Sequence, residues 1–368
     1  MATDTRTPTA ADREEHMLGH GFYNKHSHAQ GAANSYGLPL IARAVADLGS
    51  GALGGVLRLA DYGSAQGHNS LLPMKTAIEA LRARQPASAP AILVIHTDLP
   101  GNDWTTLFET VLTSAESYVS ATTDVFPFAA GTSIYRRIFP PSQIALGYSA
   151  ITTHWLSRKP GDIPDHIWSA RATGAARTAW TAQARADWYA FLGHRASELV
   201  PSGRLVMVNS GADARGNSGA EDLADVANQI LETLVREGTL FADEYAAMAI
   251  PTYYRTEREW REPFEDASFT RVHPLTLEHY EEVRLADVYL EEYGRTRDAD
   301  TFARAYAGFF RAAYEPVLFA SLRPTRPAAG GQAVKDLFAQ RMQAALAKDP
   351  ERYSARWVLP LMLVGKSG

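Results

Sequence analysis

The chain has 368 residues, of which 46% are hydrophobic and 21% charged, and its formal net charge is -5. This length allows one large domain, or a main domain with a sizeable second lobe, and the composition is typical of a globular protein. The negative charge and the lack of a long basic run argue against nucleic acid as a partner. No segment has the 18 or so consecutive apolar residues of a membrane span, so no membrane insertion is expected.

The sequence contains no cysteine. This excludes disulfides, thiolate zinc sites and cysteine nucleophiles, and it fits a cytoplasmic location, which we expect. Residues 1–16 are polar and lack the apolar stretch of a signal peptide, so we interpret them as a flexible leader. Several histidines lie near this end without acidic residues at metal-ligand spacing, and we therefore predict no metal site.

Strand-like and helix-like segments alternate in the first half of the chain. Short apolar runs predict strands over 56–60, 91–96, 143–148 and 204–209. Apolar residues at helical spacing predict helices over 71–81, 104–111 and 171–199. Such alternation is typical of a parallel sheet covered by helices.

The pattern becomes mainly helical after Gly211. We predict helices over 221–238, 242–248, 277–292 and 299–320, and the last strands within 268–272 and 352–364. The expected fold class is therefore α/β. The sheet domain is predicted over 17–211 and 321–368, and a mainly α-helical cap over 212–320.

A candidate nucleotide site follows the first two predicted strands. Asp61 and the turn Gly63–Gly67 end the first strand, where parallel sheets bind ligands and glycines allow close approach. Asp98 follows the next strand, where dinucleotide folds place an acid for ribose hydroxyls, although capping of the helix near Asp103 is an alternative role. Asp98 lies 35 residues after Gly63 instead of about 20. This gap and the absence of G-x-G-x-x-G disfavour a nicotinamide oxidoreductase.

Four segments, taken in order, resemble a known family. They read YNKHSHAQ at 23–30, ADYGSAQGHN at 60–69, DLPGNDW at 98–104, and YRRIFP followed by HWLS within 133–160. They are similar to the family's Y-x-x-N-S-x-x-Q, A-D-L-G-C-S-x-G-x-N, N-D-L-P-G-N-D-F, Y-x-R-L-F-P and W-L-S. The chain thus resembles the salicylic acid, benzoic acid and theobromine (SABATH) methyltransferases from about Met17 onward.

This resemblance implies a Rossmann-like class I methyltransferase sheet and a homodimer. It also implies S-adenosyl-L-methionine (SAM) as cofactor and S-adenosyl-L-homocysteine (SAH) as product. The implied cofactor-contacting residues are Tyr23, Ser27, Asp61, Gly63, Asn69, Asp98, Leu99, Ser133, Ile134, Ser149 and Ala150. The implied substrate-pocket residues are Tyr23, Gln30, His154, Trp155, Ser210, Ala224, Tyr253 and Phe310.

Gln30 and Trp155 are the candidate catalytic residues. In carboxyl-methylating members of the family, the Gln amide and the Trp indole N–H at these positions hold the substrate carboxylate. A carboxylate is ionised at pH 7 and needs no general base, so neutral donors suit a reaction that depends on positioning. We therefore expect a SAM-dependent carboxyl O-methyltransferase whose substrate is a small-molecule carboxylic acid.

Two alternatives stay open at this point. One is an N-methyltransferase of a xanthine-like heterocycle, an activity that the family also includes, and the other is a non-catalytic SAM-binding protein. The chain departs from the family beside Trp155, where 150–153 reads AITT instead of SYSL, and at Ala224, which replaces a bulky aromatic. These changes indicate a roomier or more polar pocket and leave the acid unidentified.

Overall fold

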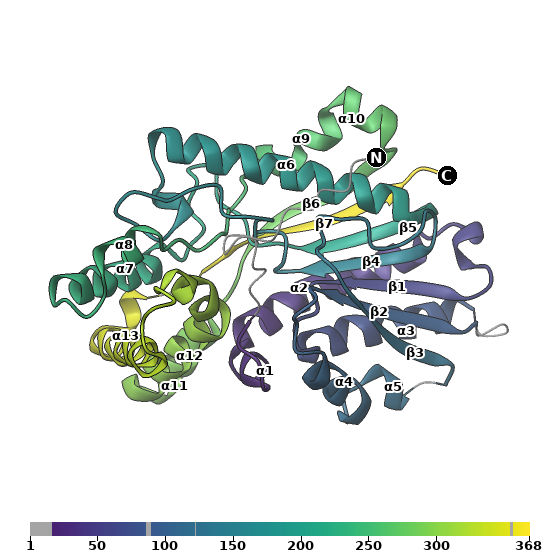
Figure 1. Cartoon of the computed structure of the whole chain (residues 1–368). Coiled ribbons are helices and arrows are strands. Elements are labelled where there is room, and N and C mark those ends of the chain that lie inside the picture. Colours follow the sequence, from purple (N-terminus) through teal and green to yellow (C-terminus); the bar gives the residue numbers. More distant parts are fainter. Residues whose placement is uncertain (1–16, 86–89, 122, 354–355) are drawn as a thin grey trace.

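The computed structural model describes residues 17–85, 90–121, 123–353 and 356–368 of the chain. The expected N-terminal leader, residues 1–16, lies outside this part. A central sheet is flanked by helices, and a further cluster of helices lies beyond one end of the sheet (Figure 1). None of the described helices is both long and apolar enough to cross a membrane.

The described residues form a seven-stranded sheet in the order β3-β2-β1-β4-β5-β7-β6. The strands are β1 (Leu57–Tyr62), β2 (Ile92–Asp98), β3 (Val125–Gly131), β4 (Ile144–Ala150), β5 (Leu199–Val208), β6 (Leu275–Arg284) and β7 (Val358–Lys366). The first five strands pair in parallel, whereas β7 is antiparallel to both β5 and β6. The predicted Rossmann-like α/β class is confirmed.

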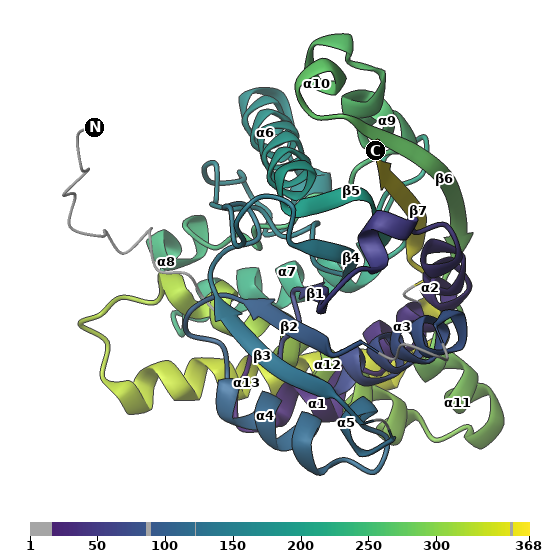
Figure 2. The ribbon, with the colours of Figure 1, turned by 90° about the vertical axis from the view of Figure 1, so that its right-hand side faces the viewer.

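Helices cover both faces of the sheet and one end of it (Figures 1 and 2). Those near the sheet are α1 (Phe22–His26), α2 (His28–Ala46), α3 (Leu71–Arg84), α4 (Trp104–Thr113), α5 (Tyr118–Ala121), α6 (Gly174–Glu198), α9 (Glu257–Glu265) and α10 (Ala267–Val272). The cluster beyond its end contains α7 (Glu221–Arg236), α8 (Ala242–Ala246), α11 (Val288–Thr296), α12 (Ala299–Leu318) and α13 (Ala328–Lys348).

Strand β5 shows why both faces need a helical layer. Successive side chains of a strand point to opposite faces of the sheet. Val206 and Val208 belong to the apolar core that includes residues of α2 and α3, whereas Leu205 and Met207 belong to a second core with Trp188 of α6. All four side chains are fully buried.

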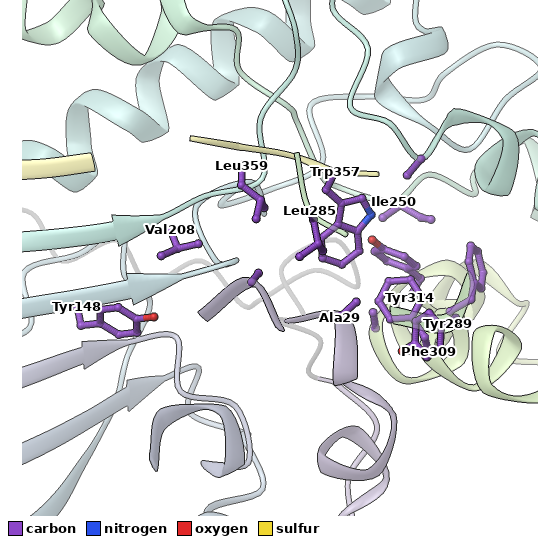
Figure 3. Packing of buried hydrophobic residues seen from close by; sticks show 14 of the residues in the cluster. Ala29, Tyr148, Val208, Ile250, Leu285, Tyr289, Phe309, Tyr314, Trp357 and Leu359 are labelled. Carbon is purple, nitrogen blue, oxygen red and sulfur yellow. The ribbon is translucent and has the colours of Figure 1, made fainter. Parts of the chain in front are cut away.

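The helical cluster packs at the carboxyl end of the parallel strands. Helix α12 contacts α1, α11 and α13, and α13 contacts α7. Figure 3 shows Tyr289, Phe309, Tyr314 and Trp357 gathered beyond the strand that carries Tyr148. This cluster therefore closes the edge of the sheet where the loops after β1, β2, β4 and β5 emerge.

Two predicted elements are wrong. The segment 268–272 is helical, as part of α10, because Asp266 caps it by accepting hydrogen bonds from the N–H groups of Ser268 and Phe269. The segment 277–292 begins as the edge strand β6, and a helix starts only at Val288. Pairing with β7 outweighs the low strand propensity of the glutamates in β6.

The division into a sheet domain and a cap stays a prediction. Strand β6 lies in the expected cap range but is part of the sheet. Helix α13 lies in the expected sheet-domain range but packs against α12. Four elements of the fold are not predicted by the apolar pattern: helices α2, α9 and α13 and strand β3.

Candidate active site

The loop after β1 is built around Gly63. Its φ is +88°, and its N–H and that of Ser64 both donate to the main-chain oxygen of Thr97, at 2.8 and 3.0 Å. A Cβ at position 63 would lie 2.2 Å from Oγ1 of Thr152, in the loop after β4. Only glycine therefore lets these two loops meet, because a side chain would be both strained and obstructed.

A first cavity, with about 380 Å³ of empty space, opens beside this loop. Five of the predicted cofactor residues line it: Tyr23, Asp61, Gly63, Asn69 and Ala150. Its walls come from α1, α2 and the loops after β1 and β4, which is the edge where parallel sheets bind ligands.

Two other predicted cofactor residues support these walls. Ser27 is buried, and its hydroxyl accepts a hydrogen bond of 3.0 Å from the amide of Asn69. Asp98, at the end of β2, accepts from the N–H groups of Ala65 at 2.7 Å and Leu99 at 2.8 Å. Burial raises the pKa of Asp98 from 3.8 to about 6 despite these hydrogen bonds, and the nearby Asp61 adds to the rise.

The remaining predicted cofactor residues do not line the first cavity or the second one described below. Ile134 packs in the core beneath α6, where its main-chain oxygen accepts from Arg195, and the hydroxyl of Ser149 donates to the main-chain oxygen of Tyr62. Ser133 accepts at its hydroxyl from the N–H of Tyr135. Their role at a cofactor, like that of Leu99, stays a prediction.

A second cavity, with about 330 Å³ of empty space, adjoins the first. Tyr23, Gln30 and Ile151 line both. The predicted residues Gln30, His154, Trp155 and Ser210 all line the second one. Gln30 therefore lies at the boundary of the two cavities.

Two buried polar atoms of this boundary region have no hydrogen-bond partner among the described residues. They are Oε1 of Gln30 and Nδ1 of His154, on side chains that are 6% and 4% exposed. Buried polar groups are nearly always hydrogen-bonded, so these two atoms are available to accept or donate a hydrogen bond to a bound molecule. Burial lowers the pKa of His154 to about 3, and Arg255 adds to the effect, which keeps the imidazole neutral at pH 7.

The second cavity has aromatic walls that the sequence did not predict. Tyr254, Tyr314 and Trp357 line it, together with Met17 and Ala313. The ring of His154 lies between those of Trp155 and Tyr254, with centroids 5.5 and 5.7 Å away. Tyr314 and Trp357, both labelled in Figure 3, each pack against the ring of Phe309, with centroids 6.0 and 5.6 Å away.

Three predicted substrate residues lie elsewhere. Tyr253 precedes a cavity residue in an extended segment, so its side chain points the opposite way, and its hydroxyl donates to Glu259 at 2.7 Å. Ala224 is part of the apolar core on α7. Phe310 lies one turn before Tyr314 on α12, and its buried ring packs behind the cavity wall against Tyr314 and Phe338, with centroids 5.1 and 5.8 Å away.

The loop that carries Trp155 is held from two sides. Its backbone forms a β-bridge with Thr252, and the N–H of Leu156 donates to the main-chain oxygen of Pro251 at 2.7 Å. The hydroxyl of Tyr135 donates to the main-chain oxygen of Trp155. This loop therefore presents His154 and Trp155 in a fixed orientation.

The side chains of the first cavity fit SAM. Asp61 provides a buried carboxylate that could bind the ammonium group of SAM, and Asn69 provides an amide in the wall of the same cavity. The unpartnered Oε1 of Gln30 lies where the cavity meets its neighbour. A Rossmann-like sheet with such a pair of adjoining cavities defines a SAM-dependent methyltransferase.

Comparison with known proteins gives the family. The family described as SAM dependent carboxyl methyltransferase matches residues 15–361, so the chain belongs to it. Known relatives of this SABATH type occur in fungi and plants. A methyltransferase from a Fusarium species is 29% identical over 306 residues, covering 81% of this chain and 80% of that protein.

Two plant relatives differ in the acceptor that their names state. A benzoic acid/salicylic acid carboxyl methyltransferase of Petunia hybrida is 28% identical over 246 residues, covering 63% of this chain and 69% of that protein. A 3,7-dimethylxanthine N-methyltransferase of Camellia sinensis var. assamica is 26% identical over 283 residues, covering 71% and 72%.

A solved structure has the same fold. Loganic acid methyltransferase with SAH superposes with a TM-score of 0.77 at 17% identity, covering 96% of this chain and 99% of that one. The likeness extends over the sheet and the helical cluster together, because it includes nearly the whole of both chains.

Proposed function

We propose that the protein transfers the methyl group of SAM to the carboxylate of a small-molecule acid, giving a methyl ester and SAH. The observation that carries this proposal is the position of Gln30, which lines both cavities while Trp155 lines the second. These two side chains offer neutral N–H donors at the place where the two ligands would meet.

The second cavity suits an acceptor that ionises by itself. Its described lining contains no Asp, Glu, Lys or Arg, and His154 is neutral because burial lowers its pKa to about 3. SAM, when bound, supplies a methyl group activated by the sulfonium. Gln30 and Trp155 would orient one carboxylate oxygen toward it, and the aromatic walls would exclude water. Such positioning contributes up to roughly 7–11 kcal/mol.

A xanthine-like acceptor is the second candidate, and the aromatic walls favour it. Trp155, Tyr254, Tyr314 and Trp357 could stack on a flat heterocycle, and one relative is an N-methyltransferase of 3,7-dimethylxanthine by name. The uncharged lining does not distinguish it from an acid. The pairing of Gln30 with Trp155 favours the carboxylate.

A coupled assay for SAH release over aromatic acids, aliphatic acids and xanthines tests the proposal. We expect turnover with acids and identification of the methyl ester by mass spectrometry. Turnover with nitrogen acceptors alone would contradict it. SAH binding by calorimetry without turnover of any acceptor would instead favour a non-catalytic SAM-binding protein.

A further inference from the structure

A buried polar chain leads from Asp61 at the end of β1, through His96 on β2, to Tyr118 in helix α5. Asp61 and His96 are register partners on the neighbouring parallel strands β1 and β2. Nδ1 of His96 lies 2.9 Å from Oδ2 of Asp61, and Nε2 of His96 lies 2.8 Å from the hydroxyl of Tyr118. Neither His96 nor Tyr118 is exposed, and Asp61 is 2% exposed.

The direction of both hydrogen bonds follows from the carboxylate of Asp61, which is an acceptor. A carboxylate accepts, so Nδ1 of His96 carries a proton and donates to Asp61. In this tautomer Nε2 is an acceptor, and the hydroxyl of Tyr118 donates to it. Burial raises the pKa of this hydroxyl well above 10, so Tyr118 keeps its proton. Both donors therefore point toward Asp61.

This arrangement occupies only one oxygen of Asp61. Oδ1 accepts no hydrogen bond from the described residues, although Asp61 lines the first cavity. A charge-assisted hydrogen bond from a fixed ring compensates a buried carboxylate for lost solvation and fixes its orientation. His96 thus leaves the second oxygen available to a ligand in the cavity.

We propose that His96 is a positioning residue for the cofactor, held by Tyr118, and that it sets the orientation of the Asp61 carboxylate toward the ammonium group of SAM. The proposal rests on the assignment of the first cavity to SAM. His96 itself does not line that cavity, so its effect on the cofactor is transmitted through Asp61.

The test is the affinity for SAH of the cofactor-free full chain, measured by calorimetry. His96→Leu removes the donor at similar volume and should weaken SAH binding by about 10- to 100-fold, the range for hydrogen bonds to charged groups. His96→Asn keeps an N–H close to the position of Nδ1 and should stay within about threefold of wild type. The KM for the acid should be unchanged in both.

Two further variants keep the test decisive. Tyr118→Phe retains the ring of His96 and removes only its second partner, so it should weaken SAH binding by roughly three- to tenfold even if His96→Leu fails to fold. Thr97→Val is the matched control, because the Thr97 hydroxyl is buried on the same strand without a partner, and it should bind SAH like wild type.

The variants distinguish an incorrect assignment of the first cavity from an incorrect role for His96. If Asp61→Asn binds SAH like wild type, the assignment of the first cavity is wrong and the proposal fails with it. If Asp61→Asn weakens binding but His96→Leu does not, the cavity assignment holds and the positioning role is overturned. If His96→Asn and His96→Leu lose SAH affinity equally, with matching losses of thermal stability, His96 only stabilises the fold and the positioning role is overturned.

Discussion

Arg255 donates a hydrogen bond of 2.7 Å from Nη1 to the main-chain oxygen of Thr153, directly before His154. Its Nη2 donates to the main-chain oxygen of Ala184 on α6, at 2.6 Å. The side chain is 1% exposed, and burial lowers its pKa. One guanidinium therefore ties the loop of the second cavity to the helix that covers the sheet.

Arg255→Met should lower the free energy of unfolding by about 2–3 kcal/mol, because two buried carbonyl groups lose a charged donor. It should also raise the KM for the acceptor, since the loop that presents Trp155 loses its anchor, while SAH affinity stays near wild type. Urea unfolding and steady-state kinetics measure the two effects. Arg255→Lys should not restore the KM, because one ammonium cannot reach both carbonyls in the geometry of the planar fork.

Gln30 and Trp155 should separate catalysis from cofactor binding. Gln30→Ala and Trp155→Ala should each lower kcat/KM for the acid by about 100-fold, since misplacement of the acceptor alone costs this much. SAH affinity, measured by calorimetry, should change by no more than about threefold, because at most one weak neutral contact to the cofactor is lost. Two variants that turn over like wild type would show that the acceptor is held elsewhere.

Gln30→Glu distinguishes the two acceptor classes. The new carboxylate would face a carboxylate substrate across an uncharged cavity and repel it, so kcat/KM for an acid should fall further than in Gln30→Ala. A neutral heterocycle would not be repelled in this way. An acid that is methylated better by Gln30→Glu than by Gln30→Ala would argue against a carboxylate at this position.

The sequence predicted the parts of the site that lie in continuous segments. Gln30, Asp61 and Trp155 each stand in a short stretch typical of the family, and all three line a cavity. Tyr254 and Tyr314 could not be found in this way, because helix and loop packing bring them to Trp155 from distant parts of the chain.

In the fold, too, elements that depend on distant parts of the chain are harder to predict than those defined by their own sequence. Strands β1, β2 and β4 are buried on both faces, because helices cover both sides of the parallel sheet. Their sequences are therefore continuous apolar runs, which are easily recognised as strands. The edge strand β6 has one paired side and many charged residues, so its strand state depends on β7, which lies more than 70 residues later. Strand β3 is the opposite edge of the sheet. Its run is short and contains Pro127, and Phe126 and Phe128 are exposed, so the apolar pattern does not predict it.

Asp98 should make cofactor affinity depend on pH. Its pKa is raised from 3.8 to about 6, so the folded protein binds this proton more tightly than the unfolded chain, and ionisation removes stability as the pH rises from about 4 to 6. Only the ionised form accepts from ribose hydroxyls at both oxygens. SAH binding should therefore be about tenfold weaker at pH 5 than at pH 7.

Calorimetry at pH 5, 6 and 7 tests this dependence, and Asp98→Asn should abolish it while weakening binding at pH 7. Asp103→Asn is the control. Against the effect of burial, hydrogen bonds from Thr106 lower the pKa of Asp103, so it stays ionised over this range. A pH dependence that persists in Asp98→Asn would assign it to another group.

His154 should account for part of the acid sensitivity of the fold. Its folded-state pKa of about 3 lies below the unfolded value of 6.5, so the unfolded chain takes up the proton first. The stability contributed by the neutral ring is complete above pH 6.5 and is lost as the pH falls toward 3. Between pH 6.5 and 4.5 the loss should be about 2 kcal/mol.

Urea unfolding of His154→Asn at these two pH values should show a decrease smaller by that amount than in wild type. Ser210→Ala, at another residue of the same cavity that does not titrate, should retain the full decrease. If both variants lose stability equally between the two pH values, His154 is not the group that responds.

Gly63→Ala should disrupt the junction of the two cavity loops. An alanine at φ +88° costs about 1–2 kcal/mol in backbone energy, and its Cβ would lie 2.2 Å from Oγ1 and 2.8 Å from Cβ of Thr152. We expect lower thermal stability and weaker SAH binding.

Adding Thr152→Gly to this variant removes the collision but not the backbone strain, so the double variant should recover part of both losses. Gly51→Ala, where a Cβ meets nothing within 4 Å, should leave SAH binding unchanged. Full recovery in the double variant would mean that the collision alone, and not the left-handed backbone, requires glycine at this turn.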